Sequence, residues 1–293
     1  MVGYESRKWW SILFQMHGSV LPALAGRVAA VGLFGAIALW LDNSTGLHLA
    51  PIAHSLVGVA LGLLLVFRTN ASYDRYWEGR KLLGAMVNRT RDFTRQVVGW
   101  VDVTATSDQA ELGRLTKLLY ATIRQALRKE TDLEALGDRI TADEKRLLAG
   151  VSSRPTVVAA WITQRTAQLC ADGHIDPFRV PSMDANMTAL LDALGGCERI
   201  VKTPIPFAYA QHIKSFLLLF CFTTPFAMVD SMGLLAPIAA MVVGFALFGI
   251  EEIGVEIEDP FGYDPNDLPL DAIGQTIDGD IDALLALRPG RPL

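Results

Sequence analysis

The chain has 293 residues, of which 51% are hydrophobic, and its mean hydropathy is +0.30. These values are high for a soluble protein of this length and indicate a membrane protein with a sizeable soluble part. A formal net charge of -5 excludes the strongly basic balance of a nucleic-acid-binding protein. The three cysteines are far apart and lack the paired spacing of a disulfide framework or a zinc site.

Four apolar stretches stand out along the chain. They cover residues 28–41, 47–67, 216–229 and 233–250. A transmembrane helix needs about 20 apolar residues, so the first and third must extend past these limits, with Arg27 and Lys214 reaching toward the interface. A buried four-helix core is the alternative, but the uninterrupted second and fourth stretches fit it poorly. The sequence therefore predicts an all-α membrane protein with four transmembrane helices.

The stretches divide the chain into four parts. Residues 1–67 are predicted to hold an interfacial helix near Trp9 and Trp10 and the first two transmembrane helices. Between Arg68 and Lys214 lie 21 of the 26 basic and 17 of the 31 acidic residues, and apolar residues recur there at helical spacing. We therefore predict a helical cytoplasmic domain at 68–212, two further transmembrane helices at 213–250, and an acidic cytoplasmic segment at 251–293.

Charge distribution predicts the orientation. Neither Lys nor Arg occurs between Val28 and Phe67, nor in the connection between the last two apolar stretches. Because basic residues accumulate on the cytoplasmic side, the sequence predicts a multi-pass membrane protein with both termini in the cytoplasm. The acidic tail carries apolar residues at helical spacing, which predicts an amphipathic helix docked on this chain or on a neighbour: Leu270, Ile273, Ile277, Ile281 and Leu284.

The second apolar stretch carries a stripe of large apolar side chains. Val59, Leu63 and Phe67 follow at i, i+4 and i+8 and cover about 12 Å of helix axis. By itself the stripe could face lipid or pack against another helix. It could also line a pore, because a hydrophobic constriction controls ion flow by dewetting.

The stretch then becomes polar without any Gly or Pro between Leu63 and Glu78, which indicates one continuous helix. Its polar side chains fall on several faces, a pattern typical of a polar network between closely packed helices. A solvated helix start with incidental charges is the alternative. We interpret these residues as a seam between subunits: Arg68, Asn70, Ser72, Asp74, Arg75 and Glu78.

Enzyme motifs are scarce, since the chain has no nucleophile elbow, phosphate-binding loop or zinc-protease motif. An enzyme hypothesis would rest on Glu251, Glu252 and Glu256 as metal-binding carboxylates without histidine partners. A membrane scaffold whose helical middle part binds a partner is a further alternative.

Four segments resemble the bacterial branch of the bestrophin family. They are FRTNASYDRYWEGRKLLG at 67–84, CERIVKTPIPFAY at 197–209, EIEDPFGYDPNDLPLD at 256–271 and, more weakly, HGSVLP at 17–22. The resemblance covers nearly the whole chain. It implies a homopentameric ion channel around one central pore, with Val59, Leu63 and Phe67 as the hydrophobic neck.

The resemblance also implies a second constriction in the middle domain, for which Phe178 is the first candidate and Ile175 the second. Animal members hold calcium in a clasp of acidic residues and backbone carbonyls. The matching positions are Glu256, Asp259, Asp264 and Asp267, whose oxygen ligands suit Ca2+ or another hard divalent cation. The bacterial branch implies passive conduction that requires no cofactor.

Ion selectivity is the last expectation. The neck residues are uncharged, so they set width rather than the sign of the permeant ion. Glu251 and Glu252, at the end of the fourth stretch, would raise the local cation concentration if they faced the pore. Together with the bacterial resemblance, this favours conduction of monovalent cations, Na+ and K+, with a chloride or other anion channel as the alternative.

Overall fold

The computed structural model describes residue 5 and residues 7–287, and these residues form helices joined by turns and loops. The chain divides into two compact units, one made of Met1–Trp77 and Thr203–Asp267, the other of Glu78–Lys202 and Leu268–Leu293. A single helix of 50 residues, α3 (Pro51–Trp100), contributes to both. The first unit thus extends beyond the apolar stretches and includes polar residues on both sides of residues 78–202.

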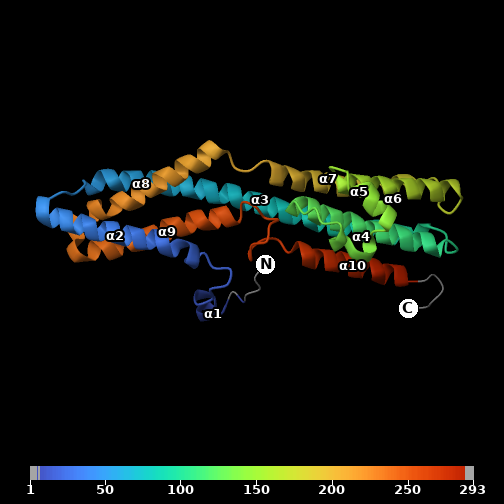
Figure 1. Ribbon diagram of the computed structural model, residues 1–293, viewed down its shortest axis with the longest axis horizontal. Helices are drawn as coiled ribbons and strands as arrows, with labels where there is room; N and C mark the ends of the chain where they lie inside the picture. Colours follow the sequence, from blue (N-terminus) through green and yellow to red (C-terminus); the bar gives the residue numbers. More distant parts are fainter. Residues whose placement is uncertain (1–4, 6, 288–293) are drawn as a thin grey trace. The chain divides into compact units, whose positions relative to one another are not determined.

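The first unit consists of helices, several of which are long and apolar. It contains α1 (Trp9–Leu13), α2 (Leu21–Thr45), the first half of α3, α8 (Phe207–Met232), the short 3-10 helix η2 (Gly233–Leu235) and α9 (Ala236–Glu256). Helices α2, α8 and α9 pack against one another (Figure 1). Apolar side chains from all three and from α3 form one buried core, which includes Leu24, Val31, Leu61, Leu65, Leu217, Phe220 and Phe248.

Three helical segments, each wholly or partly in this unit, are long and apolar enough to cross a bilayer: Leu21–Thr45, Pro51–Trp100 and Phe207–Glu256. The last contains both α8 and α9, which pack against each other and are joined at Gly233, whose φ is +52°. In each segment, less than a quarter of the apolar 18-residue stretch is buried within the chain. The prediction of an all-α membrane protein is therefore confirmed.

Close helix packing depends on glycine at particular contacts. A Cβ atom added at Gly58 of α3 would lie 2.9 Å from Cζ of Phe220, and one at Gly35 of α2 would lie 2.6 Å from Cα of Pro237. Both distances are shorter than a carbon contact allows. At Gly62, one helical turn after Gly58, an added Cβ would meet nothing within 4 Å.

We predict that Gly58→Ala destabilises the protein and that Gly62→Ala does not. The new methyl group at residue 58 must displace the Phe220 ring, which is buried and stacks on His54 at 4.3 Å between ring centroids. Overpacking of this kind costs about 1–3 kcal/mol. Thermal unfolding of the purified variants measures the difference, and equal midpoints for the two variants would contradict this account of the contact.

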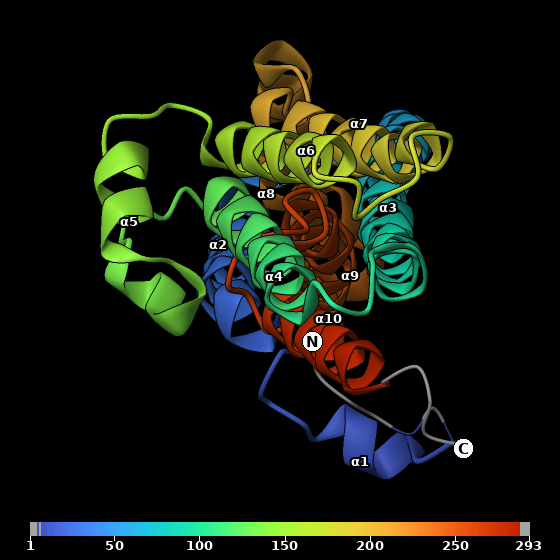
Figure 2. The same cartoon turned by 90° about the vertical axis from the view of Figure 1, so that its right-hand side faces the viewer.

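The second unit is a helical bundle arranged around α4 (Thr106–Arg128). The unit also contains the second half of α3, η1 (Glu134–Arg139), α5 (Ala142–Leu148), α6 (Arg154–Ala171), α7 (Val180–Lys202) and α10 (Leu270–Ala286). Helix α4 packs against α6, α7, η1 and α10 (Figure 2). It buries one broad face, to which the leucines that recur at spacings of three and four belong.

The acidic tail docks on this same unit through α10. Leu270, Ile277 and Ile281 are buried, and the Tyr120 hydroxyl of α4 donates a hydrogen bond of 3.0 Å to the Leu270 carbonyl oxygen. The predicted amphipathic helix is confirmed, and its docking surface belongs to this chain. Ion pairs line the contact: Arg91–Asp280, Lys117–Asp282, Arg124–Asp271, Arg128–Asp271 and Arg139–Asp278.

Asp271, which forms two of these ion pairs, predicts that the stability of the protein depends on pH. Burial raises the pKa of Asp271, but hydrogen bonds and charge from Arg128 and Arg124 lower it more, so the pKa lies below its ordinary value of 3.8. A lowered pKa stabilises the folded state above pH 3.8, and this contribution is lost as the pH falls through the folded-state pKa.

We therefore expect Asp271→Asn to be less stable than the unchanged protein at pH 7, with the difference shrinking below pH 3.8. Thermal midpoints measured across this range test the expectation. Asp138→Asn, which removes an exposed carboxylate of the same unit, is the control and should differ little from the unchanged protein at every pH. A constant difference for Asp271→Asn would contradict the assignment.

Candidate ion-conduction site

Helix α3 has one face that is buried within the first unit. Leu61, Leu65, Arg68 and Ser72 follow at i, i+4, i+7 and i+11, which places them on one side of a helix. None is more than 2% exposed. This face changes from apolar to polar at Arg68 while staying inside the protein.

The predicted neck lies on the exposed side of the same helix. Val59 is 75% exposed, and Leu63 and Phe67 are each 56% exposed. Asn70 and Asp74 are also exposed and continue the row by three and seven residues beyond Phe67. The structure therefore shows one stripe on α3 that passes from large apolar side chains to polar ones, and we call these five residues the α3 stripe.

The six residues predicted as a seam between subunits separate into different groups. Asn70 and Asp74 belong to the exposed α3 stripe, whereas Arg68 and Ser72 are buried against their own chain. Glu78 forms an ion pair with Arg199 in the second unit. The seam prediction is thus wrong for Arg68 and Ser72, because polar side chains on several faces indicate closely packed helices without showing which chain those helices belong to.

Arg68 is a buried charge with two carboxylate neighbours. Its Nη2 atom donates to Oε2 of Glu258 at 3.1 Å, and its Nε atom lies 3.9 Å from Oε1 of Glu251. Lys214 of α8 places Nζ 3.6 Å from the same Glu251 oxygen. A buried charge requires such compensation, since transfer of an isolated ion from water costs many kcal/mol.

Glu258 also joins three segments of the unit. Its Oε1 atom accepts a hydrogen bond of 3.1 Å from the backbone nitrogen of Ile205, just before α8. Its own carbonyl oxygen accepts a bond of 3.0 Å from Nε of Arg75, which also donates to the carbonyl oxygen of Thr203. Two arginines of α3 are therefore bound to the chain that follows α9 and to the chain that precedes α8. Sequence reasoning did not single out Glu258, although it stands in the acidic run of the third matched segment.

The two predicted exit acids are paired with basic side chains. Glu251 is 3% exposed and lies between Arg68 and Lys214. Oε2 of Glu252 accepts a hydrogen bond of 2.6 Å from Nη1 of Arg27. Their negative charge is locally compensated, so they do not form an open acidic ring.

The four predicted clasp residues are dispersed. Glu256, the last residue of α9, accepts a hydrogen bond of 3.0 Å from Nδ2 of Asn266, while Asp259 and Asp264 are exposed. Asp267 is 4% exposed, and its Oδ2 atom accepts from the backbone nitrogen of Asp264 at 2.7 Å. Within the described part of the chain, no group of three or more His, Cys, Asp or Glu residues could hold a metal ion. These four side chains therefore do not form a metal site by themselves, and cation binding by this segment together with backbone carbonyls stays a prediction.

The two aperture candidates behave differently in the second unit. Phe178 is 92% exposed, whereas Ile175 is only 2% exposed. Ile175 is part of the packing of its own unit, so its side chain cannot line an opening. Phe178 stays the candidate because its ring is presented away from its own chain.

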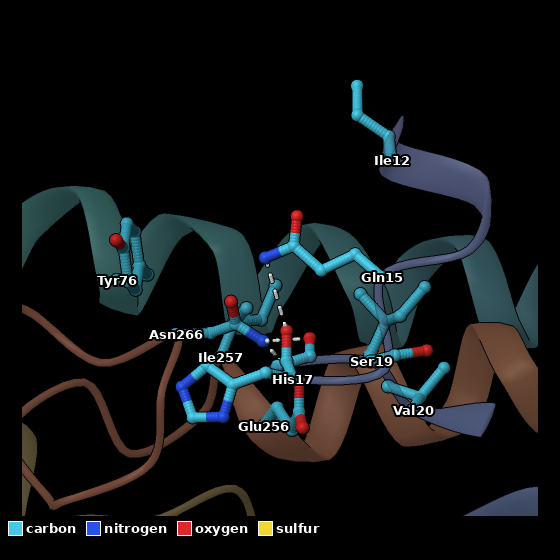
Figure 3. Close-up of a pocket in the computed structure, with 11 residues that line it drawn as sticks. Ile12, Gln15, His17, Ser19, Val20, Tyr76, Glu256, Ile257 and Asn266 are labelled. Carbon is cyan, nitrogen blue, oxygen red and sulfur yellow. Dashed lines mark hydrogen bonds between the residues drawn. The ribbon is translucent and has the colours of Figure 1, made fainter. Parts of the chain in front are cut away.

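A cavity in the first unit was not anticipated from the sequence. It has a volume of about 580 Å³ and is lined by residues 12–20, Tyr76, the end of α9 and Asn266 (Figure 3). Nδ2 of Asn266 donates to the carbonyl oxygen of Gly18 at 3.0 Å and to Oε2 of Glu256 at 3.0 Å. The one sequence signal was indirect, in that three of the four matched segments, at 17–22, 67–84 and 256–271, contribute to its wall.

Taken together, the fold and these sites define an all-helical multi-pass membrane protein. The family model of bacterial and fungal bestrophin proteins matches residues 1–283, and the chain belongs to the bestrophin family. A solved bacterial bestrophin homologue from Klebsiella pneumoniae is 27% identical, with a TM-score of 0.84, and the match covers 90% of this chain and 99% of that one. The resemblance inferred from the four segments is thereby confirmed.

Curated relatives are similar over nearly their whole length. A voltage-dependent anion channel-forming protein of a Nostoc species is 42% identical over 97% of this chain and 94% of its own length. Proteins with the same description from a Synechocystis species and from Escherichia coli K12 are 39% and 31% identical. The family is one of channels, so the chain is not an enzyme.

The expectation that Na+ and K+ are the favoured ions is contradicted by these relatives, which are named as anion channel-forming proteins. The structure provides the physical reason for the error. The argument for cations depended on unpaired acidic charge at Glu251 and Glu252, and both carboxylates are paired with basic side chains.

We predict that Arg68→Met destabilises the protein by about 3–5 kcal/mol, because Glu251 and Glu258 lose a buried counter-charge. Adding Glu251→Gln should recover part of the loss. Arg95→Met, on the same helix, removes an arginine whose side chain is 63% exposed beside Asp92, and should cost no more than about 1 kcal/mol. Thermal unfolding of the three variants measures these effects, and a loss for Arg68→Met as small as that for Arg95→Met would contradict the role assigned to Arg68.

Proposed function

We propose that this protein is an anion channel, in which several copies of the chain surround a pore that conducts chloride and similar monovalent anions down their electrochemical gradient. The observation that carries the proposal is the α3 stripe. It presents about 12 Å of apolar surface that leads directly into polar side chains on the same exposed face. The names of the relatives support the choice of anions over cations.

Exposure alone does not distinguish a pore from lipid, because α2 and α9 also expose large apolar residues. The difference is the continuation of the stripe. After Phe67 it proceeds to Asn70 and Asp74, which suit an aqueous chamber better than a hydrocarbon layer. A row of apolar side chains followed by polar ones is what a dewetting neck that opens into water requires.

Assembly follows from the geometry of a single stripe. One helix face cannot enclose a channel, so the proposal requires copies related by rotation, with the α3 stripe of each turned inward. We infer a homopentamer from the bestrophin resemblance. In it α2, α3, α8 and α9 would each cross the bacterial inner membrane, and the second unit and both termini would lie in the cytoplasm. Phe178, by its exposure, would form the cytoplasmic aperture.

Selectivity would follow from the pairing of Glu251 and Glu252 with basic side chains, which leaves no open ring of carboxylates at the end of α9. Val59, Leu63 and Phe67 are uncharged and set width. Arg27, Arg68 and Lys214 compensate the carboxylates at the end of α9. Cations would therefore not be concentrated at the end of α9. The proposed conduction requires no metal.

Recordings from the purified protein in planar bilayers test the function. In asymmetric KCl we expect currents that reverse near the chloride equilibrium potential. Reversal near the potassium equilibrium potential would refute anion conduction, and silence of a folded protein under all voltages would refute the channel.

A triple variant tests the neck. Replacing Val59, Leu63 and Phe67 together by Ala should widen the constriction, ease its wetting and raise anion flux into liposomes. The matched control replaces Leu33, Ile37 and Trp40, exposed apolar residues of α2 that the proposal places toward lipid. Unchanged flux in the folded neck variant, or an equal rise in the control, would remove the stripe from the conduction path.

A further inference from the structure

The cavity beneath α1 lies entirely within the first unit and has no role in the proposed conduction path. Its volume of about 580 Å³ is within the range of small-molecule sites. One wall is the chain from Ile12 to Val20, which reaches α2 through a turn at Gly18. Gly18 adopts a φ of +76°, a left-handed conformation that favours glycine, and this turn directs its carbonyl oxygen to Asn266.

The walls combine an apolar part with a polar part. Ile12, Val20, Ile253 and Ile257 contribute the aliphatic side chains. The polar side chains are Gln15, His17, Ser19, Glu256 and Asn266, with the ring of Tyr76 completing the wall (Figure 3). No Lys or Arg lines the cavity, so Glu256 supplies the only formal charge among its lining residues.

One of the two carboxylate oxygens of Glu256 accepts a hydrogen bond. Its Oε2 atom accepts the 3.0 Å hydrogen bond from Asn266, which is anchored in turn on Gly18. Among the described residues, no donor is found for Oε1. Nε2 of Gln15 lies 3.5 Å from the His17 carbonyl oxygen, a long contact between exposed groups.

The charge and size of the cavity restrict its occupant. An anion would be repelled by Glu256, with no Lys or Arg in the lining to offset the repulsion. A hard divalent metal ion favours several carboxylate oxygens, whereas this lining supplies one carboxylate, that of Glu256, and otherwise only neutral oxygens. A purely apolar molecule would cover the carboxylate without supplying a donor, at a cost in desolvation. An ammonium group on an apolar chain satisfies the carboxylate and the aliphatic wall together.

We propose that this cavity binds a primary ammonium group carried on an apolar chain, with the ammonium on Glu256 and the chain along Ile12, Val20, Ile253 and Ile257. The site lies beside α1, where Trp9 and Trp10 are 81% and 75% exposed, as is usual for side chains at a membrane interface. A free alkylamine has this chemistry, and an ethanolamine phospholipid presents the same primary ammonium group on a two-carbon linker that leads to its phosphate.

Calorimetric titration of the detergent-solubilised full chain tests the proposal without any channel activity. Hexylamine should bind, whereas hexanol and hexanoate, of equal chain length, should bind at least about tenfold more weakly. Equal or tighter binding of hexanol or hexanoate would overturn the proposal.

Variants locate the binding. Glu256→Gln keeps an oxygen for Asn266 but removes the charge, and should weaken hexylamine at least about tenfold. Asp259→Asn removes an exposed carboxylate three residues further on, outside the cavity, and should leave hexylamine binding unchanged. Unchanged binding in a folded Glu256→Gln protein would overturn the site.

A second variant covers the case in which Glu256→Gln fails to fold. Ile12→Ala shortens the apolar wall in an exposed segment, and should weaken hexylamine more than ethylamine. Equal effects on both amines would contradict the placement of the chain. Competition by nanodiscs rich in phosphatidylethanolamine, compared with phosphatidylglycerol, distinguishes the sources. Competition supports the ligand class with a lipid as its source, and its absence supports a soluble amine, provided that hexylamine binds.

Discussion

The ion pair between Arg68 and Glu258 determines which way α3 faces. Arg68 is 2% exposed, and a guanidinium in such a position needs nearby carboxylates to offset the loss of water. A rotation of α3 by one residue, about 100°, would remove Arg68 from Glu258 and Glu251. The outward position of Val59, Leu63 and Phe67 therefore follows from the buried pairing on the opposite face, and not from any preference of their own.

The same pairing changes the meaning of the acidic residues at the end of α9. From the sequence, Glu251 and Glu252 indicate a source of negative potential. In the structure each lies against a basic side chain from another helix. Compensation requires residues that are distant in sequence, such as Arg27 for Glu252. The effect of acidic residues at the end of a transmembrane helix can therefore be interpreted only after the basic residues that pair with them are known.

The acidic charge further along the chain has a structural use in the second unit. Asp271, Asp278, Asp280 and Asp282 line α10 and pair with arginines and a lysine of neighbouring helices, while its isoleucines are buried. Exposed pairs contribute little individually, but a row of them favours one docking position of an amphipathic helix. The tail is thus held by apolar burial and oriented by charge.

The amino-acid sequence by itself determined the class of protein, the apolar helices, the continuous α3, the amphipathic α10 and the bestrophin resemblance, because hydropathy, periodicity and short motifs are local properties. It also placed Val59, Leu63 and Phe67 on one face, since helical spacing is regular. Only the tertiary structure decided that Arg68 and Ser72 pack within their own chain, that Ile175 is buried and that Glu256 lines a cavity with Asn266. These outcomes depend on which distant segments meet, and burial and charge compensation are properties of those contacts rather than of the residues alone.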